Sequence, residues 1–229
     1  MRRILAILLC LAVLPLPVRA AETKYVALTF DDGPSGKYTR RLLDGLYDRG
    51  AKATFLLCGY RIREYPDIAQ RMVDEGHEIG IHGYSHDSMK TMSRRSIAEE
   101  IADTRALLPQ GCRVRFLRPP GGFCTDGVRQ VAQVQGLSIL SWSVDPKDWA
   151  VKDATAIQST VLKKVKDGDV VLLHDMSASS VDAALAIADA LTEKGFSLVT
   201  VSELAKQRGI QPKPGQMYTG FPETEKNVK

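Results

Sequence analysis

The sequence has few of the residues that would indicate a disulfide scaffold, a structural zinc module or a nucleic-acid-binding surface. Only 4 of its 229 residues are cysteines, and no two have the two-residue spacing of a structural zinc site. We predict that the cysteines are structural and that none is a nucleophile, although Cys112 and Cys124 could pair in an oxidising compartment. Charge of one sign is also scarce. Beyond the first twenty residues the chain has 28 basic and 27 acidic side chains. This near-neutral balance gives no electrostatic reason to expect a nucleic-acid partner.

Export is predicted by the first twenty residues. A basic start (Met1–Arg3) precedes an apolar stretch (Ile4–Val18), and small residues around Ala20 suit a cleavage site. The stretch is short and is broken by Pro15 and Pro17, so it predicts a signal peptide over residues 1–20 rather than a membrane span; an uncleaved anchor is the alternative. We therefore expect a secreted or cell-envelope protein with no stable membrane span after cleavage.

The rest of the chain alternates between short apolar runs and amphipathic stretches, with no internal linker. Seven runs are predicted as strands: Tyr25–Phe30, Ala53–Cys58, Glu78–His82, Arg113–Arg118, Ser138–Val144, Asp169–His174 and Ser197–Val201. Such alternation predicts parallel strands joined by crossover helices. The expected fold is an α/β domain over residues 21–207, a deformed or incomplete (β/α) barrel with about seven parallel strands. Residues 208–229, rich in proline and glycine, are predicted to be an extended or frayed tail.

Polar side chains follow five of the predicted strands directly. They are Asp31 and Asp32, His82 and His86, Arg118, Asp145 and Asp148, and His174. The carboxyl ends of parallel strands meet at one edge, where ligands bind in barrels and open sheets of this class. Three of the four histidines lie at these ends, and we expect the fourth, His77, to be structural.

The spacing of these residues favours a metal site. His82 and His86 are four residues apart, so one turn of chain can direct both imidazoles at a single ion. Adjacent carboxylates diverge, so one of Asp31 and Asp32 can bind a metal while the other faces a reacting group. A glycosidase is disfavoured, because neighbouring carboxylates cannot straddle a glycosidic bond. Asp, His and His together complete a metal-ligand set.

The ordered motifs resemble a known enzyme family. Thr29–Pro34, His82 to His86, Arg118–Pro120, Asp145–Trp149 and Leu172–His174 are similar to the five motifs of the NodB-type polysaccharide deacetylases, carbohydrate esterase family 4. The resemblance covers residues 24–205. It implies a deformed (β/α) barrel and metal-dependent removal of N-acetyl groups from amino-sugar polymers, such as peptidoglycan or a chitin-like glycan. Some family members remove acetyl esters from xylan, so an O-acetyl esterase is the alternative function.

The resemblance assigns the metal to Asp32, His82 and His86. One divalent transition-metal ion is expected; zinc suits two imidazoles and a carboxylate, and Co²⁺ or another divalent ion would also fit. The expected partner is a polysaccharide or oligosaccharide, bound by a monomer. A carbohydrate-binding module without activity is disfavoured because Asp31 and His174, which match the family's base and acid, are both present.

The remaining roles are also carried over from the family. Asp31 matches the base that deprotonates a metal-bound water, and Arg118 matches its ion-pair partner. His174 matches the general acid, with Asp145 expected to orient it, while Asp148 is expected to cap a turn or face water. A backbone N–H at Gly121 would stabilise the oxyanion, and Trp149 and Leu172 would form the pocket for the acetyl methyl group.

Two positions depart from the family pattern. Gly83 stands where a hydroxyl-bearing residue usually follows the first metal histidine, and Gly121 stands where an aromatic residue usually follows Arg-Pro-Pro. The oxyanion donor is a backbone group, so the chemistry should survive the second change. The groove for the sugar should be wider there, which makes the substrate harder to predict than the reaction.

Overall fold

The structure is a computed structural model that describes residues 23–223. The predicted signal peptide and residues 224–229 lie outside this range. The strands are β1 (Lys24–Asp31), β2 (Thr54–Leu57), β3 (Glu78–Ile81), β4 (Phe116–Leu117), β5 (Ser138–Leu140), β6 (Val170–His174), β7 (Phe196–Leu198) and β8 (Met217–Tyr218). The helices are α1 (Tyr38–Asp48), α2 (Gly59–Glu64), α3 (Pro66–Asp74), α4 (Arg94–Arg105), α5 (Asp126–Val134), α6 (Ala154–Lys164), α7 (Ala178–Glu193) and α8 (Val201–Gln207), with a short 3₁₀ turn η1 (Pro120–Gly122).

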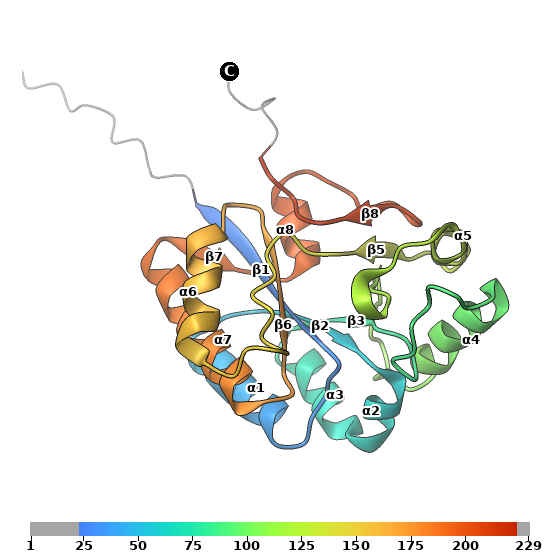
Figure 1. Cartoon of the computed structure of the whole chain (residues 1–229), viewed down its shortest axis with the longest axis horizontal. Helices are drawn as coiled ribbons and strands as arrows, with labels where there is room; N and C mark the ends of the chain where they lie inside the picture. The colour runs from blue at the N-terminus through green and yellow to red at the C-terminus, as the bar shows by residue number, and fades with distance from the viewer. Residues whose placement is uncertain (1–22, 224–229) are drawn as a thin grey trace, which may run out of the picture.

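The strands form one parallel sheet that curls into a deformed barrel, as predicted. The strand order is β6-β1-β2-β3-β4-β5-β8, and β7 pairs with the first residues of β1. Val144, just beyond β5, bridges to Val171 of β6, and Gly220, just beyond β8, bridges to Asp169. These bridges connect the two ends of the sheet. Figure 1 shows the helices around the outside of the sheet.

Alternation along β1 separates an outer core from the barrel interior. Val26, Leu28 and Phe30 are fully buried in the cluster that the sheet forms with helices such as α1 and α7. Ala27 belongs to a different cluster, which also contains Leu204 of α8. Side chains of successive strand residues point to opposite faces, so Thr29 and Asp31 continue the inner row started by Ala27. The interior is thus apolar near the start of β1 and polar at its carboxyl end.

The segment after α8 is ordered by contacts with the sheet up to Phe221. Met217 and Tyr218 form β8, which pairs with β5, and the ring of Phe221 stacks on that of Tyr218 with 5.4 Å between ring centres. Phe221 is fully buried in the interior cluster, and its N–H donates to the carbonyl of Gly168 at 2.7 Å. Burial of Phe221 and its stacking on the partly buried Tyr218 hold this segment in place despite its prolines.

Three cysteines lie in the described part of the chain, and all three are free thiols. Cys58 is buried, while Cys112 and Cys124 are partly buried. The pairing of Cys112 with Cys124 that the sequence allows is therefore not formed here. Between residues 23 and 223, no helix combines the length and the apolar character that crossing a membrane requires.

Candidate active site

The predicted site residues come together at the carboxyl ends of the strands. Asp31 ends β1 and His174 ends β6, and the two residues are direct partners in the register of these strands. His82 immediately follows β3, and Arg118 immediately follows β4. The parallel sheet thus brings four distant segments of the chain to one edge.

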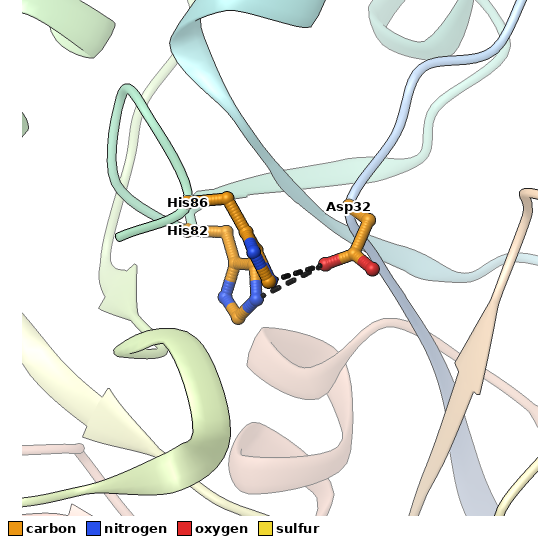
Figure 2. Close-up of side chains that lie close together, drawn as sticks. All are labelled: Asp32, His82 and His86. Atoms are coloured by element: carbon orange, nitrogen blue, oxygen red, sulfur yellow. Dashed lines mark ion pairs between the residues drawn. The ribbon is translucent and has the colours of Figure 1, made fainter. Parts of the chain in front are cut away.

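Asp32, His82 and His86, the residues that the resemblance assigns to the metal, form a cluster that could hold a metal ion, which we call the metal-ligand cluster. Figure 2 shows both imidazoles directed at the same carboxylate oxygen of Asp32. Asp32 Oδ1 lies 3.3 Å from His82 Nε2 and 3.0 Å from His86 Nε2. Asp32 and His86 both have a positive φ, of 74° and 69°, which is uncommon for residues other than glycine. The surrounding loops hold both residues in this conformation.

The cluster fits a divalent metal ion. The candidate ligand atoms all lie within 4.8 Å of one another. Zinc with bonds of about 2.0–2.2 Å would require neighbouring ligand atoms to lie about 3.3 Å apart. The distances from Asp32 Oδ1 to the two Nε2 atoms, 3.3 Å and 3.0 Å, are close to this value. Asp32 Oδ1 is also buried and has no hydrogen-bond partner, so it is an acceptor that lacks a cation. Burial alone would raise the pKa of Asp32, but its contacts with His82 and His86 outweigh burial and lower that pKa below its usual value.

His82 is oriented by the backbone. Its Nδ1 lies 2.7 Å from the carbonyl oxygen of Arg118, which can only accept, so Nδ1 carries the proton. The lone pair of Nε2 is then free for a metal, as in sites where the second ring nitrogen fixes the tautomer. His82 is buried and His86 is half-exposed.

Asp31 forms a buried ion pair with Arg118. Arg118 Nη1 donates to Asp31 Oδ1 at 2.6 Å and to Thr29 Oγ1 at 2.9 Å. The same guanidinium donates to the carbonyl oxygens of Leu140 and Ser141, at 3.3 Å and 2.8 Å. Arg118 is fully buried, so these acceptors replace the water that it loses. This network confirms the predicted contact and fixes the carboxylate of Asp31. The sequence analysis missed Thr29, which alternation along β1 could have identified as facing inward.

His174 is oriented by Asp148, so the prediction that Asp145 contacts it is wrong. His174 Nδ1 lies 2.7 Å from Asp148 Oδ1, and the His174 N–H donates to Asp148 Oδ2 at 2.8 Å. Asp145 instead accepts the N–H of Lys147 at 2.7 Å and closes a turn. Asp148 is fully buried, which argues against the water-facing position predicted for it.

The physical reason lies in the path of the chain after β5. Val144 pairs with Val171, three residues before His174. Asp145, the next residue after Val144, therefore does not yet reach the level of His174 along the strands. The turn through Pro146 and Lys147, whose φ is 58°, then carries Asp148 to the imidazole of His174. An aspartate directly before proline commonly starts a turn, and this signal, which our prediction did not use, could have identified Asp145 as the turn residue.

The surroundings of His174 favour its protonated form. Burial alone would lower the pKa of His174, but the hydrogen bond to Asp148 and the negative charges of Asp148, Asp31 and Asp32 outweigh it and raise the pKa to about 9. His174 Nε2 points toward the metal-ligand cluster, 4.0 Å from Asp32 Oδ2. A protonated imidazole is thus positioned beside the candidate metal site.

Asp175 is a buried residue that the sequence analysis did not single out. Thr39 Oγ1 donates to Asp175 Oδ2, and Ser35 Oγ donates to the Asp175 carbonyl at 2.8 Å. Burial raises the pKa of Asp175 to about 7. A Cβ at Gly33 would lie 2.5 Å from both carboxylate oxygens, so any larger residue there would force the buried carboxylate of Asp175 to move. The turn that carries Asp32 therefore packs directly on Asp175.

The three residues assigned to the oxyanion and acetyl sites differ in exposure. Gly121 lies in η1 with a φ of 69°, Leu172 lies in β6 and is 4% exposed, and Trp149 is 60% exposed. Their roles stay predictions. His77 lies elsewhere, where its Nδ1 accepts the N–H of Ala53 at 3.2 Å, as expected of a structural histidine.

Comparison with known proteins identifies the family. A model of the polysaccharide deacetylase family matches residues 19–140. The chain belongs to the NodB-type polysaccharide deacetylases. The match ends before Asp148 and His174, but full-length relatives extend it over most of the chain.

Two relatives and one solved structure illustrate what this chain is similar to. It is 38% identical to a peptidoglycan-N-acetylglucosamine deacetylase of Bacillus cereus, over 81% of this chain and 90% of the relative. It is 37% identical to the peptidoglycan-N-acetylmuramic acid deacetylase PdaC of Bacillus subtilis, over 79% of this chain, and it spans only 38% of that longer relative. A family 4 acetyl xylan esterase from Clostridium thermocellum, in complex with cobalt, superposes with a TM-score of 0.81 at 34% identity, over 87% of this chain and all of that one.

Proposed function

We propose that this deacetylase is an exported, metal-dependent enzyme that hydrolyses N-acetyl groups of peptidoglycan or a related amino-sugar polymer. The observation that carries the proposal is the arrangement at the carboxyl ends of β1 and β6. A metal-ligand cluster there lies between a carboxylate paired with arginine and an imidazole paired with aspartate. Family membership and the names of the relatives support amide hydrolysis.

Asp32, His82 and His86 would hold the metal, and no cysteine belongs to the cluster. A divalent ion bound there supplies Lewis-acid chemistry, because it lowers the pKa of water and polarises a carbonyl oxygen. Zinc suits these donors, and the cobalt complex of the Clostridium thermocellum relative supports a divalent transition metal.

Asp31 is the proposed base. It takes one proton from the water that attacks the acetyl carbonyl carbon. Arg118 holds the carboxylate of Asp31 through the 2.6 Å contact, and Thr29 shares the same guanidinium nitrogen. The base is therefore already oriented before substrate binds, which reduces the entropy cost of reaching the transition state.

His174 is the proposed acid. Its Nε2 gives a proton to the sugar nitrogen as the bond between carbonyl carbon and nitrogen breaks, which releases acetate and a free amine. Asp148 accepts the hydrogen of Nδ1 and thereby directs Nε2 at the reacting atoms. Gly121 would supply a backbone N–H to the developing oxyanion, and Trp149 and Leu172 would contact the acetyl methyl group.

An O-acetyl esterase is the alternative function. Its support is the similarity to the acetyl xylan esterase of Clostridium thermocellum, at a TM-score of 0.81. Ester and amide hydrolysis need the same base and metal, but an amine leaving group depends more on the acid His174.

The experiment that separates these functions measures acetate released from peptidoglycan, chitin oligomers and acetylated xylan by the zinc-loaded protein. We expect release from peptidoglycan or chitin oligomers to exceed release from xylan. The Asp31→Asn variant, which removes the base, should lose about a hundredfold to ten-thousandfold in rate. Faster release from xylan would favour the esterase, and no release from any substrate would refute both functions.

Export is tested separately, because the predicted signal peptide lies outside the described residues. We propose cleavage near Ala20. Sequencing the amino terminus of the protein recovered from the cell exterior should give Ala21 or a close neighbour. Recovery of the uncleaved chain in the membrane fraction would favour the anchor.

A further inference from the structure

The loop between β3 and α4 carries two of the three proposed metal ligands. His82 is the first residue of this loop, and His86 lies four residues further along it. Gly83 follows His82 with a φ of 83°, which a glycine adopts without strain, and it has no side chain with which to brace the loop. The separation of the two imidazoles therefore depends on contacts from outside the loop.

Glu100, on α4, supplies such a contact. Its Oε2 accepts the N–H of Tyr84 at 2.6 Å and the N–H of Ser85 at 2.9 Å. These are the amides of two of the three residues between the histidines. A Cβ at Gly83 would lie 3.1 Å from the same oxygen, which is tighter than ordinary contact. The glycine thus leaves room for the carboxylate to approach the backbone.

The opposite side of the loop is held by the start of α2. The N–H of Gly59 donates to the carbonyl of Gly83 at 3.0 Å, and the N–H of Tyr60 donates to the carbonyl of Tyr84 at 3.1 Å. The backbone of the loop is therefore bonded through its carbonyls to α2 and through its amides to Glu100. Only the hydrogen bonds from the amides depend on a single side chain, that of Glu100, which can be replaced by mutation.

We propose that Glu100 is a positioning residue that sets the metal affinity of the site by fixing the separation of His82 and His86. Hydrogen bonds from backbone amides to a charged carboxylate are stronger than those to a neutral acceptor. Residues that orient metal ligands in this way typically contribute about tenfold to hundredfold in metal affinity. The inference rests on the metal site of the proposed function.

The test measures zinc affinity of the metal-free protein by competition with a chromophoric chelator. Glu100→Ala should raise the zinc Kd about tenfold to hundredfold. Glu100→Gln keeps the shape and one acceptor oxygen without the charge, so its Kd should lie between those of the wild type and Glu100→Ala. Glu99→Ala is the matched control on the same helix, because Glu99 is exposed and pairs only with Arg95 in the described part of the chain; its Kd should equal that of the wild type.

Two further readouts separate positioning from a general loss of structure. Saturating zinc should restore kcat of Glu100→Ala to near the wild-type value, which a collapsed loop would not allow. In the zinc-free protein, hydrogen exchange at the amides of Tyr84 and Ser85 should be faster in Glu100→Ala than in Glu99→Ala.

The outcomes distinguish this inference from the proposed function. A wild-type zinc Kd in both Glu100 variants, with loss of zinc binding in Asp32→Ala, would overturn the role of Glu100 alone. A loss of kcat in both Glu100 variants that zinc does not restore would also overturn it. Wild-type zinc binding by Asp32→Ala would overturn the metal site itself.

Discussion

At the scale of single residues, the contact between His174 and Asp148 controls the proposed acid step. The imidazole and carboxylate are 2.7 Å apart and partly or fully buried, so the carboxylate acts on the imidazole with little screening by water. Asp145, three residues earlier, is bonded to its own turn. The two aspartates therefore provide a matched pair for mutation.

The Asp148→Asn variant should lower kcat about tenfold to hundredfold, while Asp145→Asn should change it much less. The acid must carry a proton, so the rate falls as pH rises through the pKa of His174, which is raised to about 9. Removal of the charge at Asp148 lowers that pKa, and the alkaline limb of the pH–rate profile should move to lower pH. A larger loss of kcat and a larger shift of the alkaline limb in Asp145→Asn than in Asp148→Asn would contradict this assignment.

Gly33 provides a second test at this scale. A Cβ there would meet both oxygens of the Asp175 carboxylate at 2.5 Å, so Gly33→Ala should destabilise the protein by about 1–3 kcal/mol. The strained turn also carries Asp32, so kcat/KM should fall about a hundredfold. Gly127→Ala is the control, because its Cβ would make ordinary contacts of 3.7 Å or more and alanine favours the helix. Urea unfolding gives the stability of both variants, and acetate release gives kcat/KM. A Gly33→Ala variant as stable as Gly127→Ala would refute the close packing.

At the scale of secondary-structure elements, β8 and the residues after it close the end of the barrel remote from the site. Figure 1 shows β8 beside β5 and α8 near the start of β1. Phe221 is fully buried between these elements, in the same cluster as Leu204 of α8. This packing stabilises the fold without contacting the proposed reacting groups.

The Phe221→Ala variant should therefore lose stability but not catalysis. Truncation of a buried phenylalanine costs about 3–5 kcal/mol, measured here as the free energy of unfolding in urea. Below its unfolding temperature the variant should keep the kcat of the wild type. Met217→Ala, at an exposed position of β8, should stay within about 0.5 kcal/mol of the wild type. A wild-type unfolding free energy for Phe221→Ala would mean that the segment does not close the barrel.

The elements that could be predicted from the sequence are those with a local signal. The apolar runs of β1 and β6 locate their strands, and parallel pairing then brings Asp31 and His174 together. By contrast, the strand formed by Met217 and Tyr218 is two residues long and flanked by proline and glycine. Its pairing depends on contacts with β5 that no local pattern records.

Long-range register explains what could not be predicted in the site. The choice of Asp148 over Asp145 follows from the bridge between Val144 and Val171, a property of the closed sheet. Glu100 lies on a helix 14 residues beyond His86, and only the fold brings its carboxylate to the loop. The cluster of proposed metal ligands could be predicted because histidine is rare in this chain, and three of its four histidines lie at strand ends.

At the scale of the whole molecule, the barrel separates stability from reactivity. Its interior is apolar where α8 and Phe221 close it, and polar where Asp31 and Arg118 lie at the carboxyl ends of the strands. Asp31 is held there by the buried Arg118 and His174 by the buried Asp148, so these two groups are oriented before a ligand arrives. We therefore predict that the protein folds without a metal ion and that its reaction requires one.

The most direct measurement is acetate release from peptidoglycan by the purified protein before chelation, after chelation and after zinc is returned. We predict that chelation abolishes release, that zinc restores it in the wild type, and that zinc fails to restore it in Asp32→Ala, while circular dichroism shows all forms to be folded. Undiminished release from the chelated protein, or restoration by zinc in Asp32→Ala, would contradict the account.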